Sequence, residues 1–383
     1  MELTAWLARI AARRPHLLIA EAPGGTAVRL AVERHAREQG WVVADGPADT
    51  DVLVVCGTPN QALARAVEVT WDAIAGPRSR IELVDSQVVE ALAAAVERLH
   101  DVTAQRADAG ARSDPPDGNA APADMADMDM DMDMALPGGL RMADRASDRD
   151  GLRLDVLQLQ LGPFLPAWPA GLVLDVVLQG DVVQAATAAG WWDGQALTAR
   201  SFWEQPGPGR RAAAHLDSAG RLLQLAGWSA AAGTAQELRD RALSQERSDE
   251  PAQGPADQPV GEQLARLRRQ VEASRTLRWS LRDLGVLTAD RARQVGISGP
   301  AQRADGDSWD RLRQWFDEAQ HALSGAPDGA PDGPRGSRVT GRSPSQALIE
   351  ALPALVLGLE LAGARLVVAS LDPDVGDRAV RHG

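Results

Sequence analysis

Very few side chains of this sequence could carry redox or nucleophilic chemistry. The chain has 383 residues but a single cysteine, Cys56, and it has neither lysine nor tyrosine. One cysteine cannot form a disulfide framework, hold an iron–sulfur cluster or build a cysteine-rich zinc site. The missing residue types also exclude a Schiff base, the lysine of a phosphate-binding loop and a tyrosine acid. We expect Cys56 to be a small buried hydrophobic residue of a strand, because free cysteine is usually buried.

The histidines are the remaining candidates for acid–base or metal chemistry. No two of them stand at a metal-ligand spacing, and none lies close in sequence to a serine or cysteine that could act as a nucleophile. We expect surface or capping roles, although residues distant in sequence can still meet in a triad. The six are His16, His35, His100, His215, His321 and His382. The sequence therefore assigns no catalytic, cofactor-binding or metal residue, and no cofactor is expected.

A glycine turn at residues 23–26 (PGGT) stands between a predicted strand and a predicted helix. The backbone N–H groups and the helix dipole at such a place could bind a phosphate. The turn lacks the spaced glycines of a dinucleotide fingerprint and the lysine of a P-loop. A plain strand–helix turn with Thr26 as the helix cap is the favoured interpretation.

Aspartate and methionine alternate at residues 127–134 (DMDMDMDM). In an extended segment the thioethers would lie on one side and the carboxylates on the other. Thioethers favour Cu(I), but carboxylates do not, so we favour a solvated linker. A copper-binding segment is one alternative, which predicts that Met128, Met130, Met132 and Met134 are needed for Cu(I) binding. Docking of the methionines on an apolar groove of a partner is another.

Tryptophan and arginine form two further groups. Tryptophan supplies either core packing or an interface, and the sequence leaves these two roles open. The arginines follow one predicted helix and indicate a solvated face, with an acidic partner or anionic lipid as the alternative. The tryptophans are Trp191, Trp192, Trp203, Trp228, Trp309 and Trp315, and the arginines are Arg266, Arg268, Arg269, Arg275, Arg278 and Arg282.

Strands and helices alternate over residues 1–103, which predicts a doubly wound α/β domain. The apolar run at 51–57 is typical of a central strand in a parallel sheet. The predicted helices are 2–14, 26–39, 61–74 and 87–100, and the predicted strands are 17–20, 41–43, 51–57 and 80–84.

The remainder predicts an α+β domain at 151–383, separated from the first by a disordered linker at 104–150. Residues 151–235 are expected to be rich in strands, with a hairpin turn at Gly180-Asp181. Flexible inserts are expected near 245–260 and 324–343. Beyond them we expect helices at 263–284 and 345–361 and a strand at 365–371.

The composition narrows the class of protein further. The 40 basic and 53 acidic side chains give a net charge of −13, which argues against nucleic acid as a partner. No run of 18 apolar residues predicts a membrane span. The first 20 residues do not predict secretion.

Two sets of segments resemble subunits of respiratory complex I. Residues 51–58 (DVLVVCGT), followed by 64–67, 71–72 and 76–78, resemble the B subunit. Residues 161–166 (LGPFLP) and 171–183 (GLVLDVVLQGDVV) resemble the start of the D subunit. Residues 284–288 (LGVLT) and 296–306 (GISGPAQRADG) resemble a D-subunit turn that is shared with the large subunit of nickel–iron hydrogenases. Because the B-like set precedes the D-like set, the chain resembles a fusion of the two.

The residues that carry chemistry in those families are replaced here. The B subunit binds its cluster with four cysteines, whereas this chain has only Cys56. The histidines of the D-subunit quinone pocket correspond to Leu165 and to Pro169 or Ala170, and its tyrosine has no counterpart. The paired cysteines of the hydrogenase metal site are also missing.

The resemblance therefore implies a non-catalytic structural subunit of a complex-I-like or membrane-hydrogenase-like assembly. Such a subunit would lie on the cytoplasmic face of the cell membrane, attached through membrane subunits of a complex-I-like or antiporter-like assembly. The apolar helix at 345–361 is the segment expected at that interface. The alternative from another class is an active NADH-quinone oxidoreductase-type subunit that uses a neighbour's cofactor.

Overall fold

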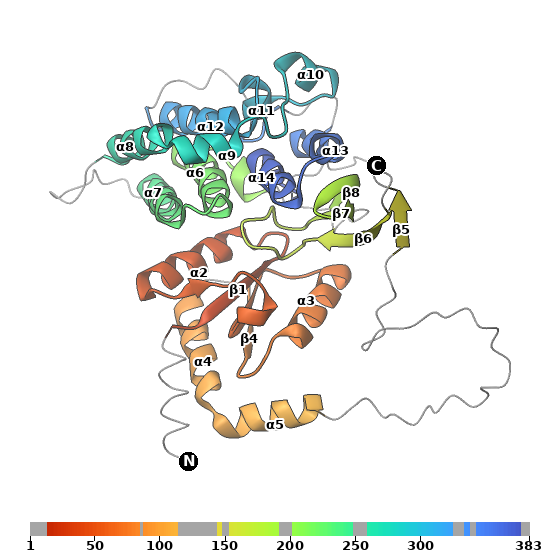
Figure 1. The fold of residues 1–383 in the computed structure, drawn as a ribbon. Helices are drawn as coiled ribbons and strands as arrows, with labels where there is room; N and C mark the ends of the chain where they lie inside the picture. The colour runs from red at the N-terminus through yellow and green to blue at the C-terminus, as the bar shows by residue number, and fades with distance from the viewer. Residues whose placement is uncertain are drawn as a thin grey trace, which may run out of the picture.

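The computed structural model describes residues 14–84, 87–113, 144–147, 153–190, 201–247, 259–324, 333–337 and 342–376. An α/β unit built around one sheet packs against a second unit, in which helices cover another sheet (Figure 1). The predicted helix at 2–14, the Asp-Met run, Trp191, Trp192 and His382 lie outside the described residues.

The first sheet is parallel and has the strand order β2-β1-β3-β4. Its strands are β1 (His16–Glu21), β2 (Val42–Val43), β3 (Val52–Cys56) and β4 (Ser79–Leu83). Within it Val54 lies opposite Ile19 of β1 and Ile81 of β4, so β3 has a neighbour on each side. All five β3 side chains are buried, which confirms the predicted central strand.

Helices cover both faces of this sheet, which confirms the doubly wound arrangement. They are α2 (Thr26–Gln39), α3 (Gln61–Ala73) and α4 (Val88–His100). Val52, Val54 and Cys56 pack with α2 and α4, whereas Leu53 and Val55 pack with α3. Successive side chains of a strand point to opposite faces, so a strand buried on both faces has no polar positions.

Both ends of the predicted linker at 104–150 hold regular structure. Helix α5 (Val102–Ser113) continues from α4 across the first ten of those positions, and strand β5 (Asp144–Ser147) lies near their end. The expected start at residue 104 was therefore wrong. The side chain of Gln105 accepts from the Arg78 N–H and donates to the Arg78 carbonyl, which ties α5 to the α/β unit.

The second sheet is antiparallel and has the order β5-β6-β7-β8. Its other strands are β6 (Arg153–Leu161), β7 (Leu172–Gln179) and β8 (Val182–Gly190). The predicted hairpin is confirmed, and Gly180 has the positive φ of 62° that its turn requires. Val183 then exchanges backbone hydrogen bonds with Gly358 and Leu359, which fastens the hairpin to the helical part.

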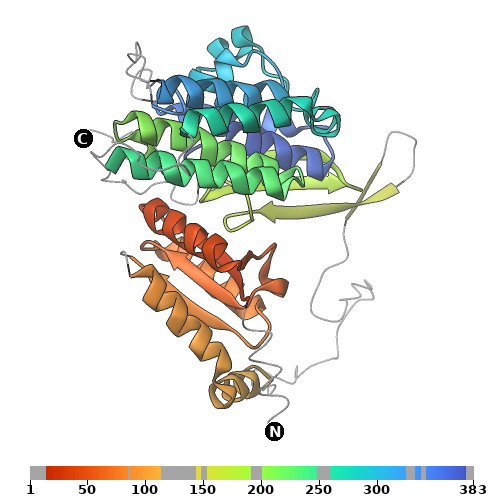
Figure 2. The ribbon, with the colours of Figure 1, turned by 90° about the vertical axis from the view of Figure 1, so that its left-hand side faces the viewer.

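Helices complete the second unit, stacked over its sheet in Figure 2. The central one is α6 (Pro208–Leu225), which packs on α7 (Ser229–Arg247), α12 (Ser308–Leu323) and α14 (Leu361–Leu371). The others are α8 (Val260–Ala273), α9 (Arg275–Leu281), α10 (Ala289–Gln294), α11 (Gly299–Arg303) and α13 (Pro344–Val356). No described helix is both long enough and apolar enough to cross a bilayer.

Three predictions for this unit were wrong. Residues 208–235 are helical rather than strand-rich, because alanines and leucines of α6 recur on its buried faces. The helix predicted at 263–284 is two helices, since Ser274 leaves the helical conformation and caps α9 through Leu277 N–H. Residues 365–371 are helical, because α14 is enclosed by α6, α12 and α13 and so is apolar on most sides.

The apolar helix expected at a membrane-subunit interface is largely internal. Helix α13 packs against β8 and α14, with Leu348, Leu352 and Val356 at most 1% exposed. Its apolar composition is therefore explained by contacts within the chain. Leu357, just after the helix, is 56% exposed.

Candidate functional site

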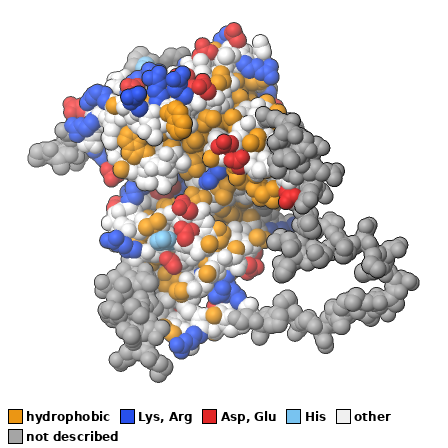
Figure 3. All heavy atoms as spheres, in the orientation of Figure 1, with side chains coloured by type: hydrophobic (Ala, Val, Ile, Leu, Met, Phe, Trp, Pro, Cys, Tyr) orange, Lys and Arg blue, Asp and Glu red, His pale blue; other side chains and the backbone are white. Residues whose placement is uncertain are grey.

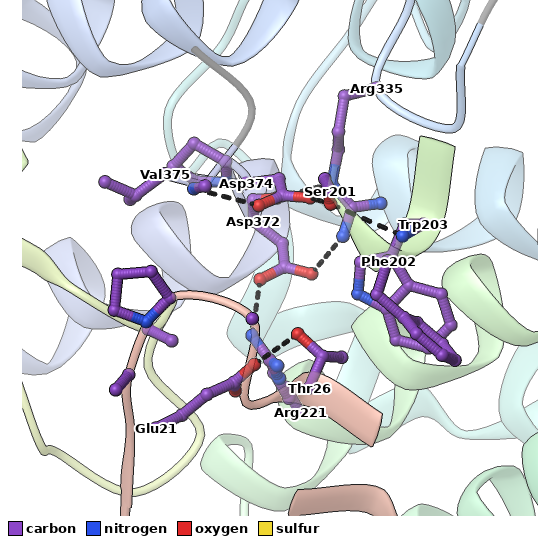
Figure 4. A pocket seen from close by; sticks show the side chains of 16 residues that line it. Glu21, Thr26, Ser201, Phe202, Trp203, Arg221, Arg335, Asp372, Asp374 and Val375 are labelled. Atoms are coloured by element: carbon purple, nitrogen blue, oxygen red, sulfur yellow. Dashed lines mark hydrogen bonds and ion pairs between the residues drawn. The ribbon is translucent and has the colours of Figure 1, made fainter. Parts of the chain in front are cut away.

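A cavity of about 250 Å³ lies where the two units meet (Figure 4). The α/β unit contributes the turn between β1 and α2, including Glu21 and Thr26. The second unit contributes Arg221 of α6, Arg335, and the segment 372–376 that follows α14. Segments far apart in the sequence therefore converge on this cavity, and we take it as the candidate site.

The β1–α2 turn has the glycine sequence that the close packing requires. A Cβ atom on Gly25 would lie 2.0 Å from the carbonyl oxygen of Cys56, so only glycine fits. The same oxygen accepts a hydrogen bond of 2.8 Å from Ala22 N–H. Thr26 does not cap α2 as predicted: Gly25 is the N-cap, and the Thr26 hydroxyl donates to Glu21 at 2.5 Å.

Asp372 joins three partners at the end of α14. The backbone of Asp372 has a left-handed φ of 38°. Its carboxylate accepts hydrogen bonds from Arg221, Arg335 and the Ser218 hydroxyl, at 3.0, 2.5 and 2.7 Å. The Asp372 backbone carbonyl accepts from Arg335 Nε at 2.6 Å. The carboxylate is 1% exposed but fully paired, as a buried charge must be.

The Arg335 guanidinium has one terminal NH2 group without a partner in the described part of the chain. Its Nε and Nη2 atoms bind Asp372, but its buried Nη1 atom has no hydrogen-bond partner within the described part of the chain. The side chain lines the cavity and is 9% exposed. Arg335 lies in the predicted flexible insert at 324–343, so at least one residue of that insert is fixed in the interior.

Asp374 is the second carboxyl group of the cavity. The Ser201 hydroxyl donates to it, and its other oxygen accepts from Gly376 N–H at 3.0 Å. Burial raises the pKa of Asp374, and the negative charges of Glu21 and Asp372 raise it further. Among the described residues, the cavity therefore offers an unpaired guanidinium donor beside a carboxyl group that holds its proton more strongly than usual.

The ion pairs continue from the cavity into the junction of the units. Asp217 of α6 is 2% exposed and contacts Arg29 of α2, Arg221 and Arg239. Burial alone would raise the pKa of Asp217, but these guanidinium groups outweigh it and hold the pKa far below its usual range. Glu33 of α2 in turn contacts Arg29 and Arg239, each at 2.6 Å.

His215 of α6 lies two residues before Asp217 in the sequence and close to the charge of Arg335. It is 1% exposed, and its Nδ1 atom has no partner among the described residues. Burial lowers the pKa of His215 well below 6.5, and the nearby charges of Arg335 and Arg211 lower it further. His215 is therefore a neutral interior residue, rather than the surface or capping residue that was predicted.

Other residues singled out from the sequence have structural places. Cys56 is fully buried, as predicted, and burial raises the pKa of its thiol. Trp203, Trp309 and Trp315 are core residues, at most 7% exposed, which confirms packing for these three. The described residues hold no group of three or more His, Cys, Asp or Glu arranged to bind a metal.

Two positions that the sequence resemblance aligned with the quinone-pocket histidines line a second cavity. This cavity of about 430 Å³ lies between α2, β2 and the loop before β7, and Leu165 and Ala170 are among its lining residues. Ala170 also borders the first cavity. Neither side chain has a polar group that could donate or accept a proton.

Sequence reasoning missed the residues that dominate the junction. Arg29, Asp217 and Arg239 belong to three helices, and the ion pair between Arg29 and Asp217 spans 188 positions. No spacing rule connects residues at that separation. For the cavity there was one local signal, Asp372-Pro373-Asp374, in which two acids directly follow an apolar run.

Comparison with known proteins found a likeness among solved structures only. No protein-family model and no curated protein matches the sequence. A chain from the structure of the membrane-bound sulfane sulfur reductase, an archaeal respiratory membrane complex, is 16% identical, with a TM-score of 0.43. The match covers 58% of this chain and 98% of that chain. A likeness at this level does not bear on activity.

Proposed function

We propose that this protein is a non-catalytic structural subunit of a complex-I-like or membrane-hydrogenase-like respiratory assembly. In this proposal the B-like and D-like units fill the place of the connecting module without passing electrons. In the same proposal the protein lies on the cytoplasmic face of the cell membrane and is attached through membrane subunits of a complex-I-like or antiporter-like assembly.

The ion-pair junction is the observation that carries the proposal. The B-like and D-like units meet through Arg29, Asp217, Glu33 and Arg239, whose charges pair with one another. Arginine and carboxylate side chains have no accessible redox state, so such a junction supports a fixed relative position of the units rather than electron transfer. The only thiol of the sequence, that of Cys56, is buried within β3.

The D-like segments support a structural role as well. In the 296–306 segment, Gly299 packs closely on Gly336. A Cβ atom added to Gly299 would lie 2.6 Å from the Cα atom of Gly336. The Ser298 hydroxyl accepts a 3.0 Å hydrogen bond from Ser337 N–H. In the hairpin, the Asp181 carbonyl accepts from Leu361 N–H at 2.7 Å. These segments therefore fix the connections between elements.

The proposal is tested by purifying the tagged full chain from detergent-solubilised native membranes. We expect mass spectrometry to find antiporter-like or complex-I-like subunits, and elemental analysis to find no iron, nickel or copper bound to this chain. A partnerless protein that carries stoichiometric metal would contradict the proposal. Stoichiometric copper would instead support the Asp-Met run as a copper-binding segment.

A second experiment separates the structural role from the active alternative. In a strain without the native gene, we expect Cys56→Ala and Asp374→Asn to restore both assembly and electron-transfer rate to the level given by the wild-type gene. These variants remove the only thiol and the carboxyl group with the raised pKa. An assembled complex that has lost its turnover in either variant would show that this subunit takes part in catalysis.

A further inference from the structure

Exposed arginines gather on helices α8 and α9. Both helices belong to the second unit, where α8 packs on α7 and α12, and both lie above the α/β unit in Figures 1 and 2. We define the α8–α9 face as Arg266, Arg269, Arg275, Arg278, Arg282 and Trp279. The whole chain is acidic, with a net charge of −13, so a cluster of five exposed cations stands out from its surroundings. Figure 3 shows basic side chains concentrated over this part of the molecule.

Most of these guanidinium groups are not neutralised by the chain itself. Apart from Arg266, none has a hydrogen bond or ion pair with a carboxylate among the residues described. The described carboxylates on or beside these two helices are fewer than the arginines. Glu272 contacts Arg268 and Arg313, and Asp317 also contacts Arg268. Glu262 and Asp283 are exposed. The α8–α9 face therefore presents net positive charge to whatever lies beside it.

Trp279 stands within this charge cluster and is 81% exposed. It lies one helical turn from Arg275 and from Arg282, so the three share one side of α9 and its end. The opposite side is held in the core by Leu277 and Leu281, which are 4% and 0% exposed. The core contacts of Leu277 and Leu281 therefore hold the indole outward.

The chemistry of the face fits a lipid headgroup layer better than a protein partner. A stable protein interface needs a desolvated apolar centre, but Trp279 and Val286 are the only large exposed apolar residues described on or next to this helix. Binding to the headgroup layer of an anionic membrane requires only cations near the membrane surface and an amphipathic ring at the interface. The α8–α9 face supplies both.

We infer that the α8–α9 face binds anionic lipid headgroups directly, with Trp279 in the interfacial layer. The inference concerns the purified chain alone, so it stands or falls separately from the proposed assembly with membrane subunits.

The test measures sedimentation of the purified full chain with vesicles. We expect binding to equimolar phosphatidylcholine and phosphatidylglycerol, weakened by added salt, and little binding to phosphatidylcholine alone. Each lost arginine should weaken binding about fivefold, so the triple variant Arg275→Gln, Arg278→Gln, Arg282→Gln should weaken it roughly a hundredfold. Trp279→Ala should weaken it several-fold at every salt concentration.

A matched control removes three exposed arginines from the α/β unit, Arg34→Gln, Arg65→Gln and Arg106→Gln. Both triples change the net charge by the same amount. Because the control leaves the α8–α9 face intact, it should retain wild-type binding. Equal losses in the two triples, or no preference for phosphatidylglycerol, would overturn the inference. If the first triple instead loses a protein partner from native membranes without losing vesicle binding, the face is a protein interface and the inference is wrong.

Discussion

Arg29 and Asp217 form a two-pronged ion pair across the junction of the two units, with Nη2 of the arginine 2.9 Å from Oδ2 and Nη1 3.3 Å from Oδ1. Both side chains are at most 6% exposed. A buried charge that loses its partner is strongly destabilising, so this pair holds the units in one relative position.

Removing the Asp217 charge should therefore destabilise the protein. Asp217→Asn leaves Arg29, Arg221 and Arg239 without their shared carboxylate, and we expect a loss of about 3–5 kcal/mol in the free energy of unfolding. Denaturant titration measures it. Asp290→Asn, which removes an exposed partner of Arg293, is the matched control and should change stability by less than about 1 kcal/mol. Equal effects of the two substitutions would contradict the role of the junction.

Acid should weaken the same junction. The pKa of Asp217 is lowered in the folded protein, despite burial, because of Arg29, Arg221 and Arg239, and that of Glu33 is lowered by Arg29 and Arg239. A carboxylate with a depressed folded pKa stabilises above its unfolded pKa of about 4, and this stabilisation is lost as the pH falls below that value. We expect the free energy of unfolding to decrease below about pH 4, and to decrease less steeply in Asp217→Asn.

His215 should produce a separate change at higher pH. Burial lowers its folded pKa well below 6.5, so the unfolded chain takes up a proton first as the pH falls through about 6.5. Stability should therefore decrease from about pH 6.5 downward, by up to about 1.4 kcal/mol per pH unit. His215→Gln should remove this slope, and the exposed His321→Gln should keep it. A slope unchanged by His215→Gln would rule out the assignment.

The β1–α2 turn should not tolerate a side chain at Gly25. The Cβ of alanine would lie 2.0 Å from the Cys56 carbonyl oxygen, in contact with backbone atoms that cannot move independently. We expect Gly25→Ala to lower the free energy of unfolding by about 1–3 kcal/mol or more. Gly46→Ala, where no atom lies within 4 Å of the added Cβ, is the control and should be nearly neutral.

Cys56 should resist thiol reagents in the folded protein. Its side chain is 0% exposed, and burial raises the pKa of its thiol, so little thiolate is accessible at neutral pH. We expect no labelling by iodoacetamide within the time that fully labels the urea-unfolded chain. Because the chain has one cysteine, mass spectrometry gives the extent of labelling directly. Rapid labelling under native conditions would show that β3 is open to solvent.

Local patterns were sufficient to predict strands in both sheets. Strand β3 is an apolar run of strand length between turns, and β6 alternates with period two, so both were predictable. Helix α14 was not: the run LVVAS is rich in residues that favour strands. Periodicity cannot distinguish a strand from a helix that is buried on most sides, and only its packing against α6, α12 and α13 decided the helix.

The sequence by itself determined the alternation of the α/β unit, the turn glycines and the chemistry that the chain cannot perform. Each of these depends on residue types or on neighbours a few positions apart. Only the tertiary structure decided that Arg29 meets Asp217, that Arg335 of an apparent insert reaches Asp372, and that His215 is interior. Burial and ion pairing depend on which distant segments pack together, and no short-range pattern encodes those contacts.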